Sequence, residues 1–421
     1  MYDIMKRFVV ILLSVVVGWP VLSAQNYKEV TNETPGQLES LLGSDWKDLD
    51  SLVVRGAINA EDILAINEYA ENLKWRVIDL WEADIADKTI PQFGLAYNHY
   101  IERVILPDDI RKLEMGAFSY TQMMKTVNIP ASLEVLSVSA FNSCLGLEGS
   151  ISIPDGVTEI GDGCFMGCFL VSHYDLPARL ESIGENTFRG CFGITGIELP
   201  STLRSIGASA FEDCYGLVAI SVPGGVEYLS DYCFRSCSEL KTVSLHPGLK
   251  TIGVGAFIRT ALETVTLPST VETIKHDAFK NISQLKSVYS MAVVPPVLEP
   301  NPAINHFDNP FGESVSEYTL YVPEGCGNAY RSATGWRDFG NIVETDDFPY
   351  SVEDAGGDAV TVAGGVGLIS VSGLNACEVT VYTADGRCVA TRLVDGAADI
   401  TVPAGMYAVV ADGRTYKVIV R

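Results

Sequence analysis

The sequence has few histidines and few basic residues for its length. Its 421 residues include five histidines, and 29 lysines and arginines stand against 53 aspartates and glutamates, which gives a net charge of −24. A chain this acidic repels the phosphates of nucleic acids and anionic membrane surfaces. The histidines are scattered and match no metal or catalytic-triad spacing: His99, His173, His246, His276 and His306. We therefore expect neither a nucleic-acid partner nor a metal site.

Catalytic and cofactor motifs are missing as well. No G-x-S-x-G, H-E-x-x-H, P-loop or dinucleotide fingerprint occurs in a suitable context, and no D-x-D-x-D-G calcium loop is present. Paired acidic residues are frequent, but a chain this acidic has them everywhere, so they indicate no site. We expect no enzymatic activity and no cofactor.

After the first 24 residues, no apolar run is long enough to span a membrane. Residues 1–24 have the pattern of a secretory signal peptide, with Lys6 and Arg7 before an apolar run from Phe8 to Val17 and a small residue, Ala24, before the expected cut. No cysteine follows that cut, so a bacterial lipid anchor is not indicated. The protein is therefore expected to be secreted or to lie on the cell surface, with no direct membrane insertion after cleavage.

One pattern returns every 22 to 24 residues between residues 105 and 290. Eight phenylalanines mark the period: Phe118, Phe141, Phe165, Phe188, Phe211, Phe234, Phe257 and Phe279. Prolines keep nearly the same step from Pro107 to Pro268. Self-similarity at such a period is typical of a solenoid in which each repeat forms one coil.

The repeat itself predicts a strand and a buried interior. In Ala219–Val222 apolar and small residues alternate, so Ile220 and Val222 should point inward, and Pro223 should end the strand. One coil buries too few large side chains, roughly 10 kcal/mol gross, to offset an ordering cost on the order of 30 kcal/mol. The coils must therefore stack on one another.

The repeat reads roughly I-x-I-P-x-x-V-x-x-I-G-x-x-A-F-x-x-C-x-x-L and resembles leucine-rich repeats of the BspA type. The resemblance implies a right-handed repeat solenoid with a parallel β-sheet on one face and a short helical or irregular convex side. That family consists largely of secreted or surface-bound adhesion and binding proteins, which implies a binding protein and not an enzyme.

The flanking residues 25–104 are expected to cap the solenoid. Residues 52–54 and 77–80 are predicted strands, and Asn59 is predicted to cap a helix with Asp62 in its first turn. The helix should bury one face, made of Ile63, Ile66, Ala70 and Leu73. The stretch 38–42 also resembles caps that precede such repeats.

Residues 291–345 resemble the closing unit of the family, with a strand, a short helix and an aromatic plug. Tyr330, Trp336 and Phe339 are expected to seal the open end of the core. Residues 346–358 are polar and rich in glycine, which predicts a linker.

From residue 359 to 421 the pattern predicts a small antiparallel β-sandwich. Seven short strands are expected: 359–362, 366–371, 377–383, 387–393, 398–402, 405–411 and 414–420. Asp385-Gly386, Asp395-Gly396 and Asp412-Gly413 are hairpin signals between them. The tail resembles the C-terminal sorting domain of type IX secretion, although the usual Pro-Asn-Pro opening is absent. Whether it sorts the protein or only accompanies the repeats stays open.

Seven of the ten cysteines occupy repeat positions. Five follow the repeat phenylalanine by three residues: Cys144, Cys168, Cys191, Cys214 and Cys237. Equivalent residues in stacked coils lie about 4.8 Å apart, whereas a disulfide prefers β-carbons near ~3.8 Å. We therefore expect a buried column of free thiols. In the tail, Cys388 should pair with Thr383 across a two-residue turn, which leaves Cys377 roughly 20 Å away and excludes a disulfide within that hairpin.

The solvent-facing strand positions are the expected ligand surface. They are small and polar, from Thr126 and Asn128 to Thr264 and Thr266, and only His173, Asp175 and Glu198 form a charged cluster. We expect these three residues to contact a host or extracellular protein or glycan, with micromolar or weaker affinity. Two alternatives stay open: ligands contact the caps or convex loops, or the protein is a structural spacer or matrix component that carries its C-terminal domain.

Overall fold

The computed structural model describes residues 26–42, 49–304, 307–349, 361–364, 368–383, 388–403, 405–411 and 414–420. The predicted signal peptide, residues 1–24, lies outside this range. The chain divides into two units, residues 1–350 and residues 351–421. The boundary falls inside the segment predicted to be a linker.

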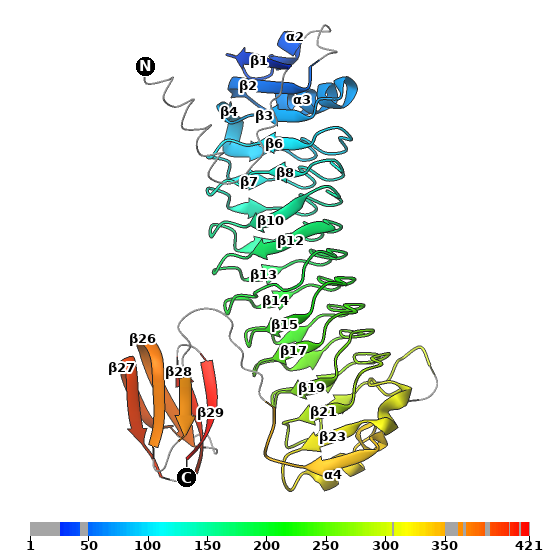
Figure 1. Cartoon of the computed structure of the whole chain (residues 1–421), viewed down its shortest axis with the longest axis vertical. Helices are drawn as coiled ribbons and strands as arrows, with labels where there is room; N and C mark the ends of the chain where they lie inside the picture. Colours follow the sequence, from blue (N-terminus) through cyan, green and yellow to red (C-terminus); the bar gives the residue numbers. More distant parts are fainter. Residues whose placement is uncertain are drawn as a thin grey trace. The chain divides into compact units, whose positions relative to one another are not determined.

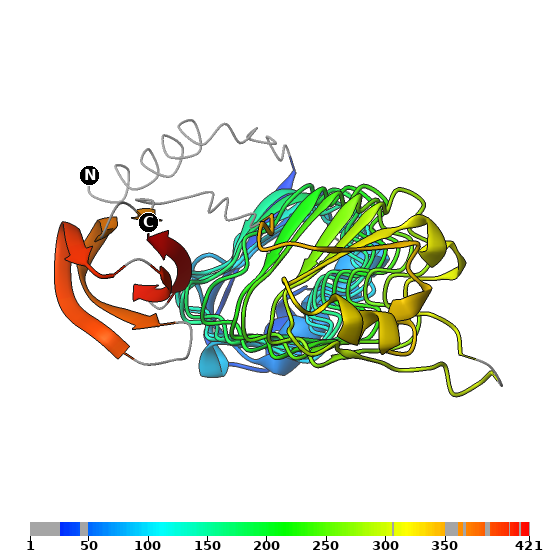
Figure 2. The ribbon, with the colours of Figure 1, turned by 90° about the horizontal axis from the view of Figure 1, so that it is seen from below.

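A main ladder of parallel strands runs along the length of the first unit, and most coils contribute one strand to it (Figure 1). Alternation of small and apolar residues produces these strands, and in β15 the burial pattern alternates as predicted, with Ile220 and Val222 buried. Figure 2 looks along the stack and shows the coils lying behind one another. The strands are β1 (Tyr27–Asn32), β2 (Ser51–Ile58), β3 (Val77–Asp79), β6 (Arg103–Ile105), β8 (Thr126–Val127), β10 (Glu148–Ser152), β12 (Leu170–Asp175), β15 (Ala219–Val222), β17 (Thr242–Leu245), β19 (Thr264–Leu267), β21 (Ser287–Ser290), β23 (Thr319–Val322) and β24 (Asn341–Glu344).

The main ladder is interrupted at three places, between β8 and β10, between β12 and β15, and between β17 and β19. The second interruption lies in the coil that contains Gly196. The predicted strand around Ile197–Leu199 is not formed, so β12 pairs only with β10, and β15 only with β17. Glycine weakens a strand because it costs backbone entropy and offers no side chain to pack. Ile197 is still buried and Glu198 exposed, so the coil keeps its inward and outward positions without the strand pairing.

A second ladder of ten two-residue strands runs along another side of the coils and was not predicted. Neighbouring strands of this ladder pair in parallel. Ile206, which follows the proline turn of its repeat, belongs to this ladder. A Cβ at Gly207 would lie 2.4 Å from the main-chain nitrogen of Glu185, so the repeat glycine permits neighbouring coils to approach. The strands are β5 (Thr89–Ile90), β7 (Lys112–Leu113), β9 (Val135–Leu136), β11 (Glu159–Ile160), β13 (Ser182–Ile183), β14 (Ser205–Ile206), β16 (Tyr228–Leu229), β18 (Thr251–Ile252), β20 (Thr273–Ile274) and β22 (Val297–Leu298).

The rest of each coil is made of turns. Between residues 89 and 298, all of which the structure describes, no helix occurs. Of the two alternatives expected for the convex side, short helices or irregular structure, this stretch has the irregular one. A repeat of 22 to 24 residues that forms two strands and the turns between them leaves little chain for a helical segment.

The repeat phenylalanines form one buried column in the core. All eight are fully buried, and neighbouring rings stack with centroids 5.1 to 5.8 Å apart. Phe311 adds a ninth ring, 4.9 Å from Phe279. The prediction that these rings are core, and not a surface for ligands, is confirmed.

The N-terminal residues extend the main ladder and add a helix. As predicted, α3 (Ala60–Leu73) starts at Asn59, which forms a capping box with Asp62. The Asp62 carboxylate is buried and also accepts hydrogen bonds from the main-chain nitrogens of Gly36 and Leu38, at 2.7 and 2.9 Å. These bonds attach α2 (Leu38–Leu42) to α3. Two strands that pair with β2 were not predicted, β1 and β4 (Ala83–Ile85).

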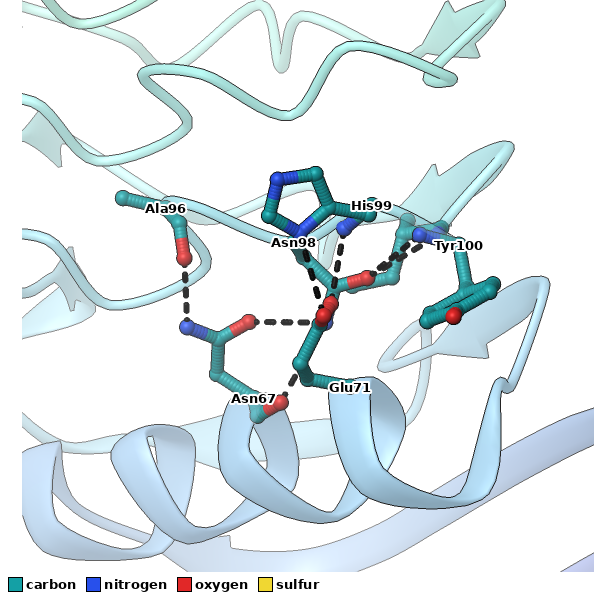
Figure 3. Close-up of polar contacts among 7 residues, drawn as sticks. Asn67, Glu71, Ala96, Asn98, His99 and Tyr100 are labelled. Carbon is teal, nitrogen blue, oxygen red and sulfur yellow. Dashed lines mark hydrogen bonds and ion pairs between the residues drawn. The ribbon is translucent and has the colours of Figure 1, made fainter.

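Polar contacts attach α3 to the first coils (Figure 3). The buried Asn98 donates to the main-chain oxygen and the side-chain Oδ1 of Asn67, and its own Oδ1 accepts from the main-chain nitrogens of Tyr100 and Ile101. His99 contacts Glu71 through its main-chain nitrogen at 2.7 Å and through Nδ1 at 3.0 Å. His99 thus has a structural partner within the cap.

The C-terminal end of the core is closed as predicted. Tyr330 on α4 (Gly327–Ser332), Trp336 and Phe339 are all buried, and the Trp336 indole donates to the Pro296 carbonyl at 2.7 Å. Beyond the expected strand, β23, the chain forms one further parallel strand, β24.

The second unit contains one antiparallel sheet of five strands: β25 (Thr361–Gly364), β26 (Leu368–Thr383), β27 (Cys388–Thr401), β28 (Gly405–Ala411) and β29 (Arg414–Val420). Of the seven predicted strands, the last two are confirmed as β28 and β29, and the first overlaps β25. The other four are wrong as separate strands, because they merge into the long β26 and β27. Asp395-Gly396 lies inside β27, where the register with β26 is irregular, instead of forming a turn. Cys388 pairs with Tyr382 and not with Thr383, because the register between β26 and β27 shifts by one residue between Val381 and Tyr382.

Candidate functional site: the outward face of the main ladder

The outward face consists of the solvent-facing residues of the main strand ladder. Parallel pairing places equivalent residues side by side, as in Ser152 beside Asp175 and Ser221 beside Ser244. Side chains alternate along a strand, so every second residue of each main-ladder strand belongs to this face. The face is therefore a set of rows that run along the stack.

The predicted contact residues His173 and Asp175 lie together on β12. The Nε2 atom of His173 is 2.8 Å from Oδ1 of Asp175, and the two side chains are 50% and 58% exposed. An exposed pair of this kind contributes little to stability, about 0–1 kcal/mol. Its imidazole and carboxylate are accessible to a ligand.

Glu198 is exposed in the next coil, on the stretch that does not form a strand. Within the described residues, no hydrogen bond or ion pair joins Glu198 to His173 or Asp175. The structure therefore brings two of the three predicted residues into contact, and the third lies one coil further on.

A second histidine lies on the same face. His246 Nε2 is 2.9 Å from the Ser221 hydroxyl, across the β15–β17 pair. The spacing of the histidines in the sequence gave no indication of this contact, because it depends on the register of two coils. The outward face thus carries two imidazoles, three coils apart and each hydrogen-bonded.

The C-terminal end of the outward face carries aromatic residues that were not predicted as part of the site. Tyr289 on β21 lies next to Thr266 on one side and Tyr321 on the other. The two phenol rings stack with centroids 4.4 Å apart, and Phe348 lies edge-on to Tyr289 at 6.4 Å. The sequence does contain an indication of this site, because Tyr289 occupies the repeat position of Thr266 and tyrosine is enriched at tight interfaces.

The N-terminal end of the face is strongly charged. Arg55 on β2 forms ion pairs with Glu29 at 2.9 Å and with Glu82 at 2.8 Å. Burial raises the pKa of the nearby Asp79 carboxyl. Trp81, the second residue after β3, is 42% exposed. The outward face therefore has larger side chains at both ends than in its middle.

The buried thiols of the repeats lie away from this face. Burial raises the pKa of Cys191 to about 12, and it raises the pKa of the other repeat cysteines as well. All seven are free and fully buried. A thiolate is the reactive form of cysteine, so these positions favour packing over nucleophilic chemistry.

Comparisons with known proteins identify the repeats. Residues 88–178 and 158–286 match the model of the BspA type leucine rich repeat region, in six copies. A leucine-rich repeat protein from Bacteroides ovatus is similar at 17% identity, over 75% of this chain and 82% of that one, with a TM-score of 0.48. A leucine rich cell surface protein from Faecalibacterium prausnitzii is similar at 17% identity, over 76% and 83% of the two chains, with a TM-score of 0.33.

The pneumococcal vaccine antigen PcpA is similar at 15% identity, over 65% of this chain and 85% of that one, with a TM-score of 0.33. No curated protein matches this chain. Among the described residues, no helix combines the length and the apolar composition needed to cross a membrane.

Proposed function

We propose, on the premise that residues 88–286 consist of BspA-type leucine-rich repeats, that the protein is a non-enzymatic binding protein of the cell surface or the extracellular medium. Its repeats present the outward face to an extracellular protein or glycan. The expected signal peptide supports export. The resemblance of the tail to a type IX sorting domain supports a surface location.

One observation carries the proposal: the outward positions of paired coils lie in register and carry mainly small, hydroxyl-bearing side chains. Ala219 and Ser221 lie beside Thr242 and Ser244, and Thr264 and Thr266 lie beside Ser287 and Tyr289. Solenoids commonly bind through such extended surfaces. Small hydroxyl side chains offer hydrogen bonds over a large area but few anchors, so we expect micromolar or weaker affinity in the middle of the face.

His173, Asp175 and Glu198 supply polarity and orientation in this middle section. The imidazole and two carboxylates are exposed, and they break an otherwise uncharged row. A ligand that spans two coils can contact all three. The absence of any link between Glu198 and the other two leaves its carboxylate available for such a contact.

The test is a glycan array together with a pull-down from mucus and serum proteins, with the chain from Gln25 to Arg421 as bait. For any ligand found, the triple change His173→Ala, Asp175→Ala and Glu198→Ala should weaken binding at least tenfold. Glu159→Ala with Glu181→Ala, on the side of the second ladder, removes the same number of negative charges and should leave affinity unchanged. Unchanged affinity in the triple variant, with a wild-type circular dichroism spectrum, would move the site to the caps or the convex turns.

A further inference from the structure

The five residues after β24 fold back over the outward face. The Thr345 main-chain nitrogen donates to the Val322 carbonyl at 2.8 Å, and the Asp347 nitrogen donates to the Thr345 hydroxyl at 3.0 Å. The Pro349 carbonyl then accepts from the Thr266 hydroxyl on β19 at 3.2 Å. Because β19 lies three strands before β24 in this sheet, the segment runs back along the stack (Figure 1). We name residues 345–349 the strap.

The strap makes an aromatic contact in the middle of its path. Phe348 lies edge-on to Tyr289, at 73° between the ring planes, and Tyr289 stacks on Tyr321. Both tyrosines and Phe348 are half-buried, although the strap's neighbouring residues Asp347 and Pro349 are exposed. The ring of Phe348 is therefore the side chain through which the strap packs on the face.

We propose that Tyr289, Tyr321 and Thr266 form a docking site for an extended peptide that carries an aromatic side chain. The strap is the cis occupant of this site, and a partner reaches it only by displacing the strap. The inference rests on the proposed function for the choice of face, and it adds the class of partner and a competing segment of the chain itself.

The contacts seen are ones that any extended polypeptide can make. A main-chain carbonyl accepts from a hydroxyl, and a ring packs edge-on against a second ring. The rows of hydroxyls continue onto the preceding coil, where Thr242 and Ser244 on β17 occupy the repeat positions of Thr264 and Thr266. A longer peptide that enters at the tyrosines can therefore follow these rows.

Tethering makes the strap a strong competitor. A short linker holds a cis segment at an effective concentration on the order of millimolar. A free peptide that makes the same contacts should displace the strap from only a small fraction of the molecules. Binding of such a peptide to the site should therefore increase when Phe348 is removed.

Saturation-transfer difference NMR on the chain from Gln25 to Arg421 tests this, with a synthetic capped peptide of sequence Glu-Thr-Asp-Asp-Phe-Pro-Tyr as the probe. The Phe348→Ala variant should transfer saturation to the peptide phenylalanine ring at least fivefold more strongly than the wild type. Adding Tyr289→Ala to Phe348→Ala should return the signal to background.

Phe192→Ala is the matched control, because it removes a partly exposed phenylalanine outside the strap, and its signal should equal that of the wild type. Equal signals in wild type and Phe348→Ala, or a signal that survives Tyr289→Ala, would overturn the proposal. The probe is a defined peptide, so this result can be read even if the ligand screen finds nothing and the proposed function fails.

Discussion

Each of the five column cysteines donates its thiol hydrogen to the carbonyl oxygen of the phenylalanine one coil earlier. The Sγ–O distances are 3.1 to 3.2 Å, as between Cys214 and Phe188 or between Cys237 and Phe211. Alanine would fill part of the same space but donate nothing. Cysteine therefore combines a small apolar body with a weak donor, in a place where water does not reach the carbonyl.

This geometry predicts a column that is reduced but unreactive in the native protein. Iodoacetamide at pH 8 should modify the partly exposed Cys326 well before Cys191, because burial raises the pKa of Cys191 to about 12 and keeps it protonated. Peptide mapping by mass spectrometry checks the order. In urea without reductant, all seven buried repeat cysteines should react, and resistance of the column to alkylation there would indicate disulfides.

Phe211 lies in the middle of the ring column, 5.2 Å from Phe188 and 5.4 Å from Phe234. Phe211→Ala should lower the free energy of unfolding by about 3–5 kcal/mol, since it leaves a cavity between two rings. Urea unfolding followed by circular dichroism measures the change. Unfolding like that of the wild type would show that the column is not the core of the coil.

At the scale of the strand, ion pairs link successive coils at the edge of the main ladder. Glu102, just before β6, accepts from Arg76 before β3 at 2.7 Å and from Lys125 before β8 at 3.1 Å. Burial alone would raise the pKa of Glu102, but the hydrogen bonds from Lys125 and Arg76 lower it below its ordinary value of 4.5.

A carboxyl whose pKa is lowered by folding stabilises the protein above its unfolded pKa, and this stabilisation is lost as the pH falls through the folded value. Glu102→Gln should therefore lower the free energy of unfolding by about 1 kcal/mol at pH 7. The difference from the wild type should shrink as the pH drops below 4.5. Urea titrations at several pH values check this, and a difference that stays constant down to pH 3 would contradict it.

The main ladder could be predicted from the sequence and the second ladder could not, because the strands of the second ladder are too short to show a pattern. Alternation over four residues, as in Ala219–Val222, reports which face is buried. A two-residue strand such as Ser205–Ile206 shows no alternation, and only its pairing with the neighbouring coils reveals it. Helix α3 was predictable because its cap at Asn59 and its buried face both lie within one segment.

The candidate site was predictable only where it depended on one strand. His173 and Asp175 are two residues apart on β12, and their contact follows from alternation. The contact between His246 and Ser221 joins two coils, and the strap joins residue 349 to residue 266. Asp346, Asp347 and Pro349 have the composition of a linker, so their position on the face could not be inferred from it.

At the scale of the whole molecule, the first unit has a single continuous hydrophobic core from Val30 to Phe339. Its two ends are closed differently. The N-terminal end uses polar bonds to Asp62 and Asn98, and the C-terminal end uses the rings of Tyr330, Trp336 and Phe339. Open ends of a solenoid expose core side chains to water, so such closing units are required for solubility.

The repetition of identical contacts also bears on how such a chain can change in length. The repeat phenylalanines stack from coil to coil, five coils add a thiol bonded to a carbonyl, and some, such as the coil of Gly207, add a glycine at the point of closest approach. Recombination between two copies of the repeat would add or remove a whole coil and leave the next pair of surfaces matched. Such recombination would change the length of the solenoid in steps of about 5 Å, the spacing between strands, and would keep the same fold.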